Sequence, residues 1–260
     1  MKIPAITGII RRRILLNYRI APDVVESILP EAFSPKLVRG HSIAGICLIR
    51  LEHIRPKGFP RFIGISSENS AHRIAVEWNH EDGTRREGVF VPRRDTDSKL
   101  NSFAGGRLFP GVHHLSQFNV DDHGKHISVR VDSGRPEAPL VELKVYHSDE
   151  FPSGSVFSSL SESSDFFEAG CVGYSSRPNS CRLDGLLLKV PDWKVSVVDT
   201  EYIKSAYFDD TSIFPRGSIE FDHALLMRDI PHEWHSEPEK DSREKPANKS
   251  LQATGTSPAA

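Results

Sequence analysis

The sequence predicts an α+β fold that is mainly antiparallel β-sheet, strongly curved or closed, with a few short helices. Short runs rich in β-branched and apolar residues recur along the chain, which is typical of strands. Turn residues such as Asp82-Gly83 separate neighbouring runs, as in β-hairpins. Only two or three brief stretches carry helix boundaries. Hairpin-linked strands pair antiparallel, and so many of them favour a curved or closed sheet.

The first third of the chain predicts one helix and several strands. The helix enters at Pro22 and Asp23, where proline and a carboxylate suit a first turn, and it stops at Pro30. A strand over residues 42–54 carries apolar residues on both faces, so we expect it to be buried on both sides. Strands over 61–66, 71–78 and 87–91 follow, and the last is expected to end at Pro92.

Residues 85–117 hold most of the chemically useful side chains. After the strand, Arg93, Arg94, Asp95, Asp97 and Lys99 crowd into a charged elbow. We expect Asp97 or Ser98 to cap a short helix that runs to residue 104 and ends at two glycines. A return strand is predicted from residue 107 through Pro110-Gly111 to the pair His113-His114.

The second half repeats the same strand-and-turn pattern around one more helix. The expected helix covers residues 159–169, opened by a serine and closed by Gly170. The expected strands cover 115–120, 126–131, 140–147, 181–190, 194–202 and 214–226, with a turn at 121–125. We predict one domain over residues 1–234 and a disordered tail over 235–260, where only Leu251 could anchor to a core.

Composition limits the classes of function. The 260 residues, 38% of them hydrophobic, suffice for one large core. Lys plus Arg number 33 against 35 Asp plus Glu, so no basic field favours nucleic acid. Three cysteines cannot form a disulfide framework, and no segment resembles a secretory signal or a membrane span. We therefore expect a cytoplasmic protein with neither a nucleic-acid nor a membrane partner.

Two sets of charged residues could form a site. Arg94 and Asp95 lie in the elbow, where paired guanidinium donors could clamp a carboxylate; the alternative is a solvated loop of internal ion pairs. Glu68 and Arg73 lie close together where two expected strands meet, and a buried carboxylate there could transfer protons. A structural ion pair is the alternative for that pair.

The adjacent histidines His113 and His114 point to opposite faces of a strand, so at most one of them can serve one pocket as a general base. A purely structural role for both remains open. A metal-site hypothesis would combine the two histidines with four residues of the next hairpin: Asp121, Asp122, His123 and His126. Their spacing matches no metal motif, and no glycine-rich phosphate loop or serine-nucleophile elbow is present, so we predict no metal and no cofactor.

Five segments in this order resemble the DUF2071, or YqjF-like, family of the acetoacetate decarboxylase-like superfamily. These segments are 20–33, 42–60, 68–73, GGRLFPGVHH at 105–114, and 214–234. The resemblance covers nearly all of the predicted domain. It implies a closed or cone-like antiparallel β-barrel around a central cavity.

The resemblance departs from acetoacetate decarboxylases at one place. Those enzymes form a Schiff base through one of two tandem lysines, whereas the comparable place here ends in His113 and His114. An imidazole cannot form an iminium, and the nearest other amines by sequence, Lys99 and Lys144, lack a neighbouring lysine. An enzyme of this kind would be lyase-like without the tandem lysines.

Three hypotheses follow. The first is a cavity that binds a small organic acid or ketone through Arg73 or Arg94, with Glu68, His113 or His114 moving protons in non-covalent chemistry. The second is a catalytically inactive binding or interaction module. The third is a Schiff-base decarboxylase that uses Lys99 or Lys144. Homo-oligomerisation stays open in all three.

Overall fold

The computed structural model describes residues 4–80, 82–106, 109–124, 126–133 and 139–243, and its named strands belong to one sheet. The helical elements are α1 (Pro22–Ile28), η1 (Arg61–Ile63, a 3-10 turn), α2 (Lys99–Ala104) and α3 (Leu160–Ala169). The strands are β1 (Ile6–Ile20), β2 (Ser34–Pro35), β3 (Leu37–Val38), β4 (His41–Pro56), β5 (Ile65–Asn79), β6 (Arg85–Thr96), β7 (His113–Leu115), β8 (Gln117–His123), β9 (His126–Asp132), β10 (Val141–His147), β11 (Val172–Ser176), β12 (Arg182–Lys189), β13 (Ser196–Ser205) and β14 (Ile219–Asp241).

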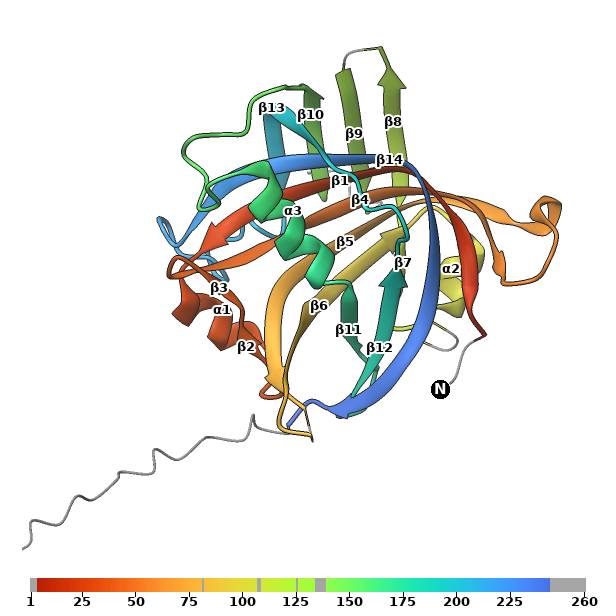
Figure 1. The fold of residues 1–260 in the computed structure, drawn as a ribbon, viewed down its shortest axis with the longest axis horizontal. Helices are drawn as coiled ribbons and strands as arrows, with labels where there is room; N and C mark the ends of the chain where they lie inside the picture. Colours follow the sequence, from red (N-terminus) through yellow and green to blue (C-terminus); the bar gives the residue numbers. More distant parts are fainter. Residues whose placement is uncertain (1–3, 81, 107–108, 125, 134–138, 244–260) are drawn as a thin grey trace, which may run out of the picture.

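Seven strands close into a ring. They follow the order β1-β4-β5-β6-β11-β12-β14, and β14 pairs back to β1. Closure depends on the length of β14, which sweeps from beside β1 to beside β12 (Figure 1). The first and last strands of the fold are therefore neighbours.

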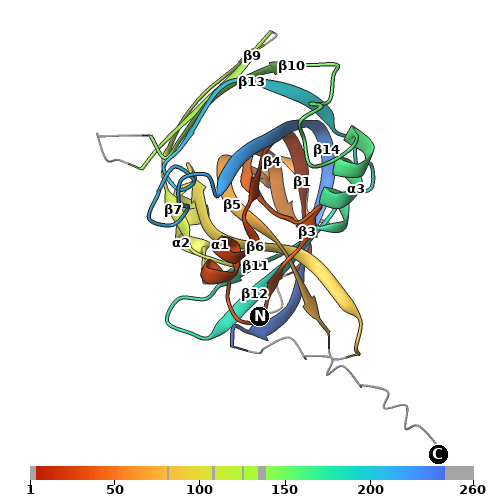
Figure 2. The same cartoon turned by 90° about the vertical axis from the view of Figure 1, so that its left-hand side faces the viewer.

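A second layer covers part of the outer face of the ring. From β14 the sheet continues through β13, β10 and β9 to β8, and these strands arch over β14, β1 and β4 (Figure 2). The main core fills the space between the layers. Its fully buried members include Ile14, Leu16, Ile46, Leu48, Ile127, Val129, Leu143 and Val145. Because side chains alternate along a strand, the neighbours of these residues on β1 and β4 face the interior of the ring.

A bulge at Pro92 decides which charged residues of β6 face inward. Between the pairs His72↔Arg93 and Ile74↔Phe90, β6 has one residue more than β5. Proline cannot donate to the ladder and is tolerated at such a bulge. The extra residue reverses the alternation, so Val89 and Val91 line the interior before it and Arg94, not Arg93, lines it after.

The three expected helices are confirmed. Helix α1 has Pro22 in its first turn. The Ser98 hydroxyl caps α2 by accepting from the Asn101 amide, and Ser159 caps α3 in the same way. Gly105 and Gly170 follow the last residues of α2 and α3.

Several predicted strand limits are wrong. Residues 61–63 form η1 instead of a strand, and β5 then runs unbroken over two predicted strands. Strand β6 passes through Pro92 because of the bulge. Of the predicted return strand, His113–Leu115 forms β7 and Phe109 makes an isolated bridge with Gly105, since Gly111 turns the chain between them with a positive φ; residues 107–108 lie outside the described residues. Strand β8 continues to His123, so the turn after it is tighter than expected.

The last strand also differs from its expected limits. It begins at Ile219 and continues to Asp241, into the predicted tail. Pairing explains this extension, because β12 supplies a hydrogen-bonding partner from Lys189↔Glu233 to Arg182↔Asp241. Residues 244–260 of that tail lie outside the described residues.

The predicted fold class is confirmed as α+β with a mainly antiparallel sheet closed into a ring. Its parallel pairings among the named strands are β6 with β7 and β6 with β11. Across the described part of the chain, none of the helices is both long and apolar enough to traverse a lipid bilayer.

Candidate functional site

A cavity of about 180 Å³ lies inside the ring. Every strand of the ring contributes to its lining, with Arg13 from β1, Cys47 from β4, Arg73 from β5, Arg94 from β6, Gly173 from β11, Leu186 from β12 and Trp234 from β14. This volume is comparable to that of an engineered cavity of about 150 Å³ that binds benzene, so the cavity suits a small metabolite.

Two of the predicted arginines lie in this cavity. The Arg94 Nε donates to the Ser175 hydroxyl at 3.3 Å. Arg73 is only 4% exposed; its Nη2 donates to the side-chain oxygen of Asn17, while Nε and Nη1 are buried without a partner. Burial lowers the pKa of each guanidinium to about 10. Within the described residues, no carboxylate pairs with either arginine.

Arg13 is a third cation in the cavity. It was not predicted from the sequence as a site residue. Its Nε lies 3.2 Å from the Cys47 sulfur, and its guanidinium carbon lies 5.6 Å from the centre of the Trp193 ring. In the chain that the structure describes, it too has no carboxylate partner. Three consecutive arginines in an apolar strand cannot all face one side, and alternation with the buried Leu15 was the available signal.

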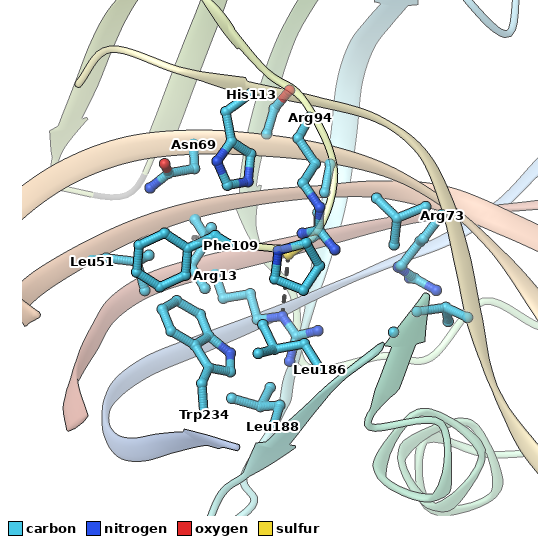
Figure 3. A pocket seen from close by; sticks show the side chains of 18 of the residues that line it. Arg13, Leu51, Asn69, Arg73, Arg94, Phe109, His113, Leu186, Leu188 and Trp234 are labelled. Atoms are coloured by element: carbon cyan, nitrogen blue, oxygen red, sulfur yellow. Dashed lines mark hydrogen bonds between the residues drawn. The ribbon is translucent and has the colours of Figure 1, made fainter. Parts of the chain in front are cut away.

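His113 projects into the same cavity close to Arg94 (Figure 3). Its Nδ1 lies 3.3 Å from the Asn101 carbonyl oxygen; a carbonyl only accepts, so Nδ1 carries the proton and Nε2 is the basic nitrogen. Burial, together with the positive charge of Arg94, lowers the pKa of His113 to about 4. The imidazole is therefore neutral near pH 7.

The cavity has an apolar side. Leu51, Phe109 and Trp234 gather away from Arg73, and Leu186 and Leu188 continue this surface (Figure 3). Polar amides lie elsewhere in the lining, at Asn69 and Asn101. The lining thus combines guanidinium donors with an apolar surface, as expected for a ligand that has a charged end and a hydrocarbon body.

Asp95 is held by its own strand. Arg93, two residues before it on the same face, binds it with both Nε and Nη2, at 3.0 and 2.8 Å. The hydroxyl of Ser116 donates to the same carboxylate at 3.0 Å. Asp95 is part of the cavity lining, but its oxygens are already engaged, and its predicted role in substrate binding stays a prediction.

Glu68 faces away from the cavity and is not part of its described lining. The Arg12 Nη2 donates to its carboxylate at 2.6 Å, and Arg12 also reaches Asp122 at 3.2 Å. Burial raises the pKa of Glu68, although the Arg12 charge opposes this effect. Its placement matches the structural ion pair left open as the alternative, except that its partner is Arg12 and not Arg73.

His114 is exposed and points away from the cavity, beside a separate surface hollow. Lys99 is exposed, and Lys144 pairs with Glu201 at 2.8 Å on β10. No lysine belongs to the described lining of the cavity. Nor do the described residues contain a group of three His, Cys, Asp or Glu side chains placed to hold a metal ion.

A buried polar network supports Arg73 from behind. The Asn17 amide nitrogen lies 3.1 Å from the Nε2 of His223, and the Nδ1 of that ring lies 2.6 Å from Asp222. Burial lowers the pKa of His223 despite Asp222, so its neutral ring donates to Asp222 from Nδ1, while Nε2 accepts from the Ser163 hydroxyl at 2.7 Å and from Asn17. Asn17 is thereby oriented with its oxygen toward Arg73. This network was not predicted from the sequence, because its members lie far apart in the chain.

Comparison with known proteins places the chain in a family. Residues 9–205 match the model of DUF2071, described as an uncharacterized conserved protein. The chain belongs to the DUF2071 family. No curated protein sequence matches it.

Solved structures show a shared fold. Acetoacetate decarboxylase from Legionella pneumophila is 10% identical, with a TM-score of 0.63 over 91% of this chain and 88% of that one. An acetoacetate decarboxylase-like enzyme from Sphingomonas wittichii RW1 is 13% identical, with a TM-score of 0.59 over 93% of each chain. The enduracididine biosynthesis enzyme MppR, complexed with pyruvate, is 11% identical, with a TM-score of 0.55 over 93% and 91%. The DUF2071 chain therefore has an acetoacetate decarboxylase-like fold, as expected.

Proposed function

We propose that this DUF2071 protein binds a small organic acid or ketone in the cavity of the ring, with Arg94 and Arg73 holding its carboxylate or carbonyl oxygen. The observation that carries the proposal is the pair of guanidinium groups in the cavity, Arg73 buried and Arg94 half-buried, without a carboxylate partner in the described chain. Burying an unpaired charge is costly, so such groups are expected to meet an anion from outside. The fold is shared with MppR, which was solved with pyruvate bound.

His113 supplies the proton transfer in this proposal. With Nδ1–H fixed on the Asn101 carbonyl, Nε2 can accept a proton from the ligand carbon next to a carbonyl group. The C–H bond breaks, an N–H bond forms, and the electron pair moves to the carbonyl oxygen beside Arg94. A guanidinium stabilises the resulting oxyanion. Neither Glu68 nor His114 is part of the described lining, so we assign the proton transfer to His113.

A binding module without catalysis is the second candidate. The low pKa of His113 favours it, because a weakly basic imidazole removes protons poorly from carbon. The Schiff-base alternative is less well supported. Neither Lys99 nor Lys144 lies at the cavity, and Lys36, in an adjoining hollow, pairs with Glu87 at 2.6 Å. The free cysteines Cys47, Cys171 and Cys181 support the proposed cytoplasmic location.

Thermal-shift and calorimetric titration with pyruvate, acetoacetate and 2-oxobutanoate test the proposal. We expect saturable stabilisation that is lost in Arg94→Gln and kept in Arg11→Gln. Arg11 is an exposed arginine paired with Glu52 and Asp229, so the control removes the same charge outside the cavity. Exchange of ligand protons with deuterium, followed by NMR, separates the two candidates, since a binding module accelerates none. Absence of binding by any small carboxylate or ketone would contradict both.

A further inference from the structure

We infer that the ligand of this cavity is a dianion, a small dicarboxylate or an equivalent molecule with two anionic groups joined by a short apolar body. This inference rests on the proposed function and specifies its ligand class. It is carried by the three guanidinium groups of Arg13, Arg73 and Arg94, which line one cavity of about 180 Å³ without a carboxylate partner in the described chain.

The positive charge of the cavity favours a ligand with more than one anionic group. Asp95 is the acidic residue of the described lining, and its charge is already matched by Arg93. Three cations remain, and one carboxylate would neutralise one of them. Arg13 and Arg73 also repel each other, since the charge of Arg13 contributes to the lowered pKa of Arg73. Like charges in a low-dielectric interior destabilise each other strongly, so a second anionic group is favoured.

The positions of the arginines define two anion sites. Arg94 lies beside His113, whose pKa it lowers, and together with Asn101 this end forms the first site. Arg13 and Arg73 form the second site, because both also line a smaller adjoining hollow of about 30 Å³. An anionic end placed in that hollow would meet both of these cations.

The second site is built to receive an anion. Arg73 is 4% exposed, and its Nε and Nη1 are buried without a hydrogen-bond partner. Its third nitrogen is fixed by Asn17, and the Phe167 ring lies 4.5 Å from its guanidinium carbon. The fork is therefore held in place while two of its nitrogens lack a partner. Nε–H and Nη1–H lie on different sides of the guanidinium and diverge, so each can donate a charge-assisted hydrogen bond to a separate anionic oxygen.

A matched ligand series tests the inference. Calorimetric titration compares succinate, glutarate and 2-oxoglutarate with monomethyl succinate and 2-oxobutanoate. We expect each dicarboxylate to bind at least about tenfold more tightly than the monoanions, because it gains charge-assisted hydrogen bonds at the second site. Arg13→Gln should remove most of this preference by weakening the binding of dicarboxylates far more than the binding of 2-oxobutanoate. Arg11→Gln, which removes the same charge from an exposed position on the same strand, should leave both unchanged.

The outcomes of these titrations test the dianion inference, the proposed function and the role of Arg13 separately. Monoanions that bind as tightly as dicarboxylates would overturn the dianion inference and leave the proposed function standing. Failure of both classes to bind would overturn the proposed function itself. An unchanged preference in Arg13→Gln would remove Arg13 from the second site. If Arg13→Gln does not fold, the ligand series on the unaltered protein still decides the inference.

Discussion

Two pairs of adjacent arginines lie on strands of the ring. In each pair one side chain faces outward and the other faces the cavity. Arg12 and Arg93 face outward and are bound by carboxylates, Arg12 by Glu68 and Asp122, and Arg93 by Asp95. Their neighbours Arg13 and Arg94 face the cavity and, in the described chain, have none. The four side chains have the same chemistry, and they are separated by strand alternation and, on β6, by the bulge at Pro92.

The difference separates structural arginines from those that we propose bind a ligand. An outward arginine neutralises a buried carboxylate of the fold, so its loss should affect stability. An inward arginine lacks such a partner, so its loss should affect ligand affinity and leave the folded state intact. Stability and affinity measurements on matched variants can therefore test whether the two kinds of arginine differ in this way.

The largest effect is expected for Arg12→Met. Arg12 is 3% exposed, and its removal leaves Glu68 buried without its cation, which should lower the free energy of unfolding by about 3–5 kcal/mol. Urea denaturation at pH 7 measures it. The double variant Arg12→Met/Glu68→Met should recover much of the loss. Arg13→Met is the matched variant and should cost far less; an equal cost would contradict the comparison.

Arg94→Gln should weaken binding of the preferred carboxylate by about 10- to 100-fold, since it removes hydrogen bonds to a charged group. The free energy of unfolding without ligand should stay level or rise, because a desolvated cation is removed. Calorimetry and denaturation on the same preparation check both. Arg93→Gln should behave in the opposite way, with Asp95 left buried and stability reduced. Loss of stability in Arg94→Gln with unchanged affinity would reverse the assignment.

Acid should destabilise the protein between about pH 6.5 and pH 4. Burial lowers the pKa of His72, His113 and His232 from 6.5 to about 4, so the unfolded chain binds protons in this range before the folded chain does. Stability is complete above pH 6.5 and falls as pH drops, by up to about 1.4 kcal/mol per histidine and pH unit. Denaturation at a series of pH values measures the slope, and a flat profile would contradict it.

Ligand binding should separate the inner histidine from the outer one. His113 lies in the cavity, whereas His72 is buried outside the ring against Tyr207 and Phe208. A bound anion should raise the pKa of His113 and leave that of His72 unchanged. NMR titration of the ring protons with and without succinate checks this, and equal shifts at both rings would place the anion elsewhere.

The smallest effect is expected at the two lysines proposed for Schiff-base chemistry. Lys99→Gln and Lys144→Gln should change neither ligand affinity nor turnover, since both residues lie away from the cavity. Borohydride reduction in the presence of acetoacetate, followed by peptide mass spectrometry, should find no adduct at either position. An adduct at Lys99 or Lys144 would restore the decarboxylase hypothesis.

The sequence predicted the fold class and most elements because alternation and turn chemistry are local. Helix α2, its Ser98 cap and Gly105 could be found in this way. The bulge at Pro92 could not, because it depends on pairing with β5. The extension of β14 to Asp241 was not predicted for the same reason, since its polar residues form a strand only when they pair with β12.

The site was predicted less completely than the fold. Arg73, Arg94 and His113 were candidates by residue type, and the structure brings them to one cavity. Arg13 was missed because its neighbours made it part of a basic triplet near the N-terminus. Glu68 and Arg73 lie five positions apart on one strand and project to opposite sides of it. Their proximity in sequence was therefore a poor guide to proximity in space.

Closure of the ring by β14 has a consequence for how the protein is made. Among the described strands β1 is synthesised earliest, and it must wait for β14, about two hundred residues later, before its second edge is paired. Until then the arginines of the interior remain in contact with water. The proposed binding site is thus among the last features to form, and nascent chains that stop short of β14 should not bind the proposed ligand.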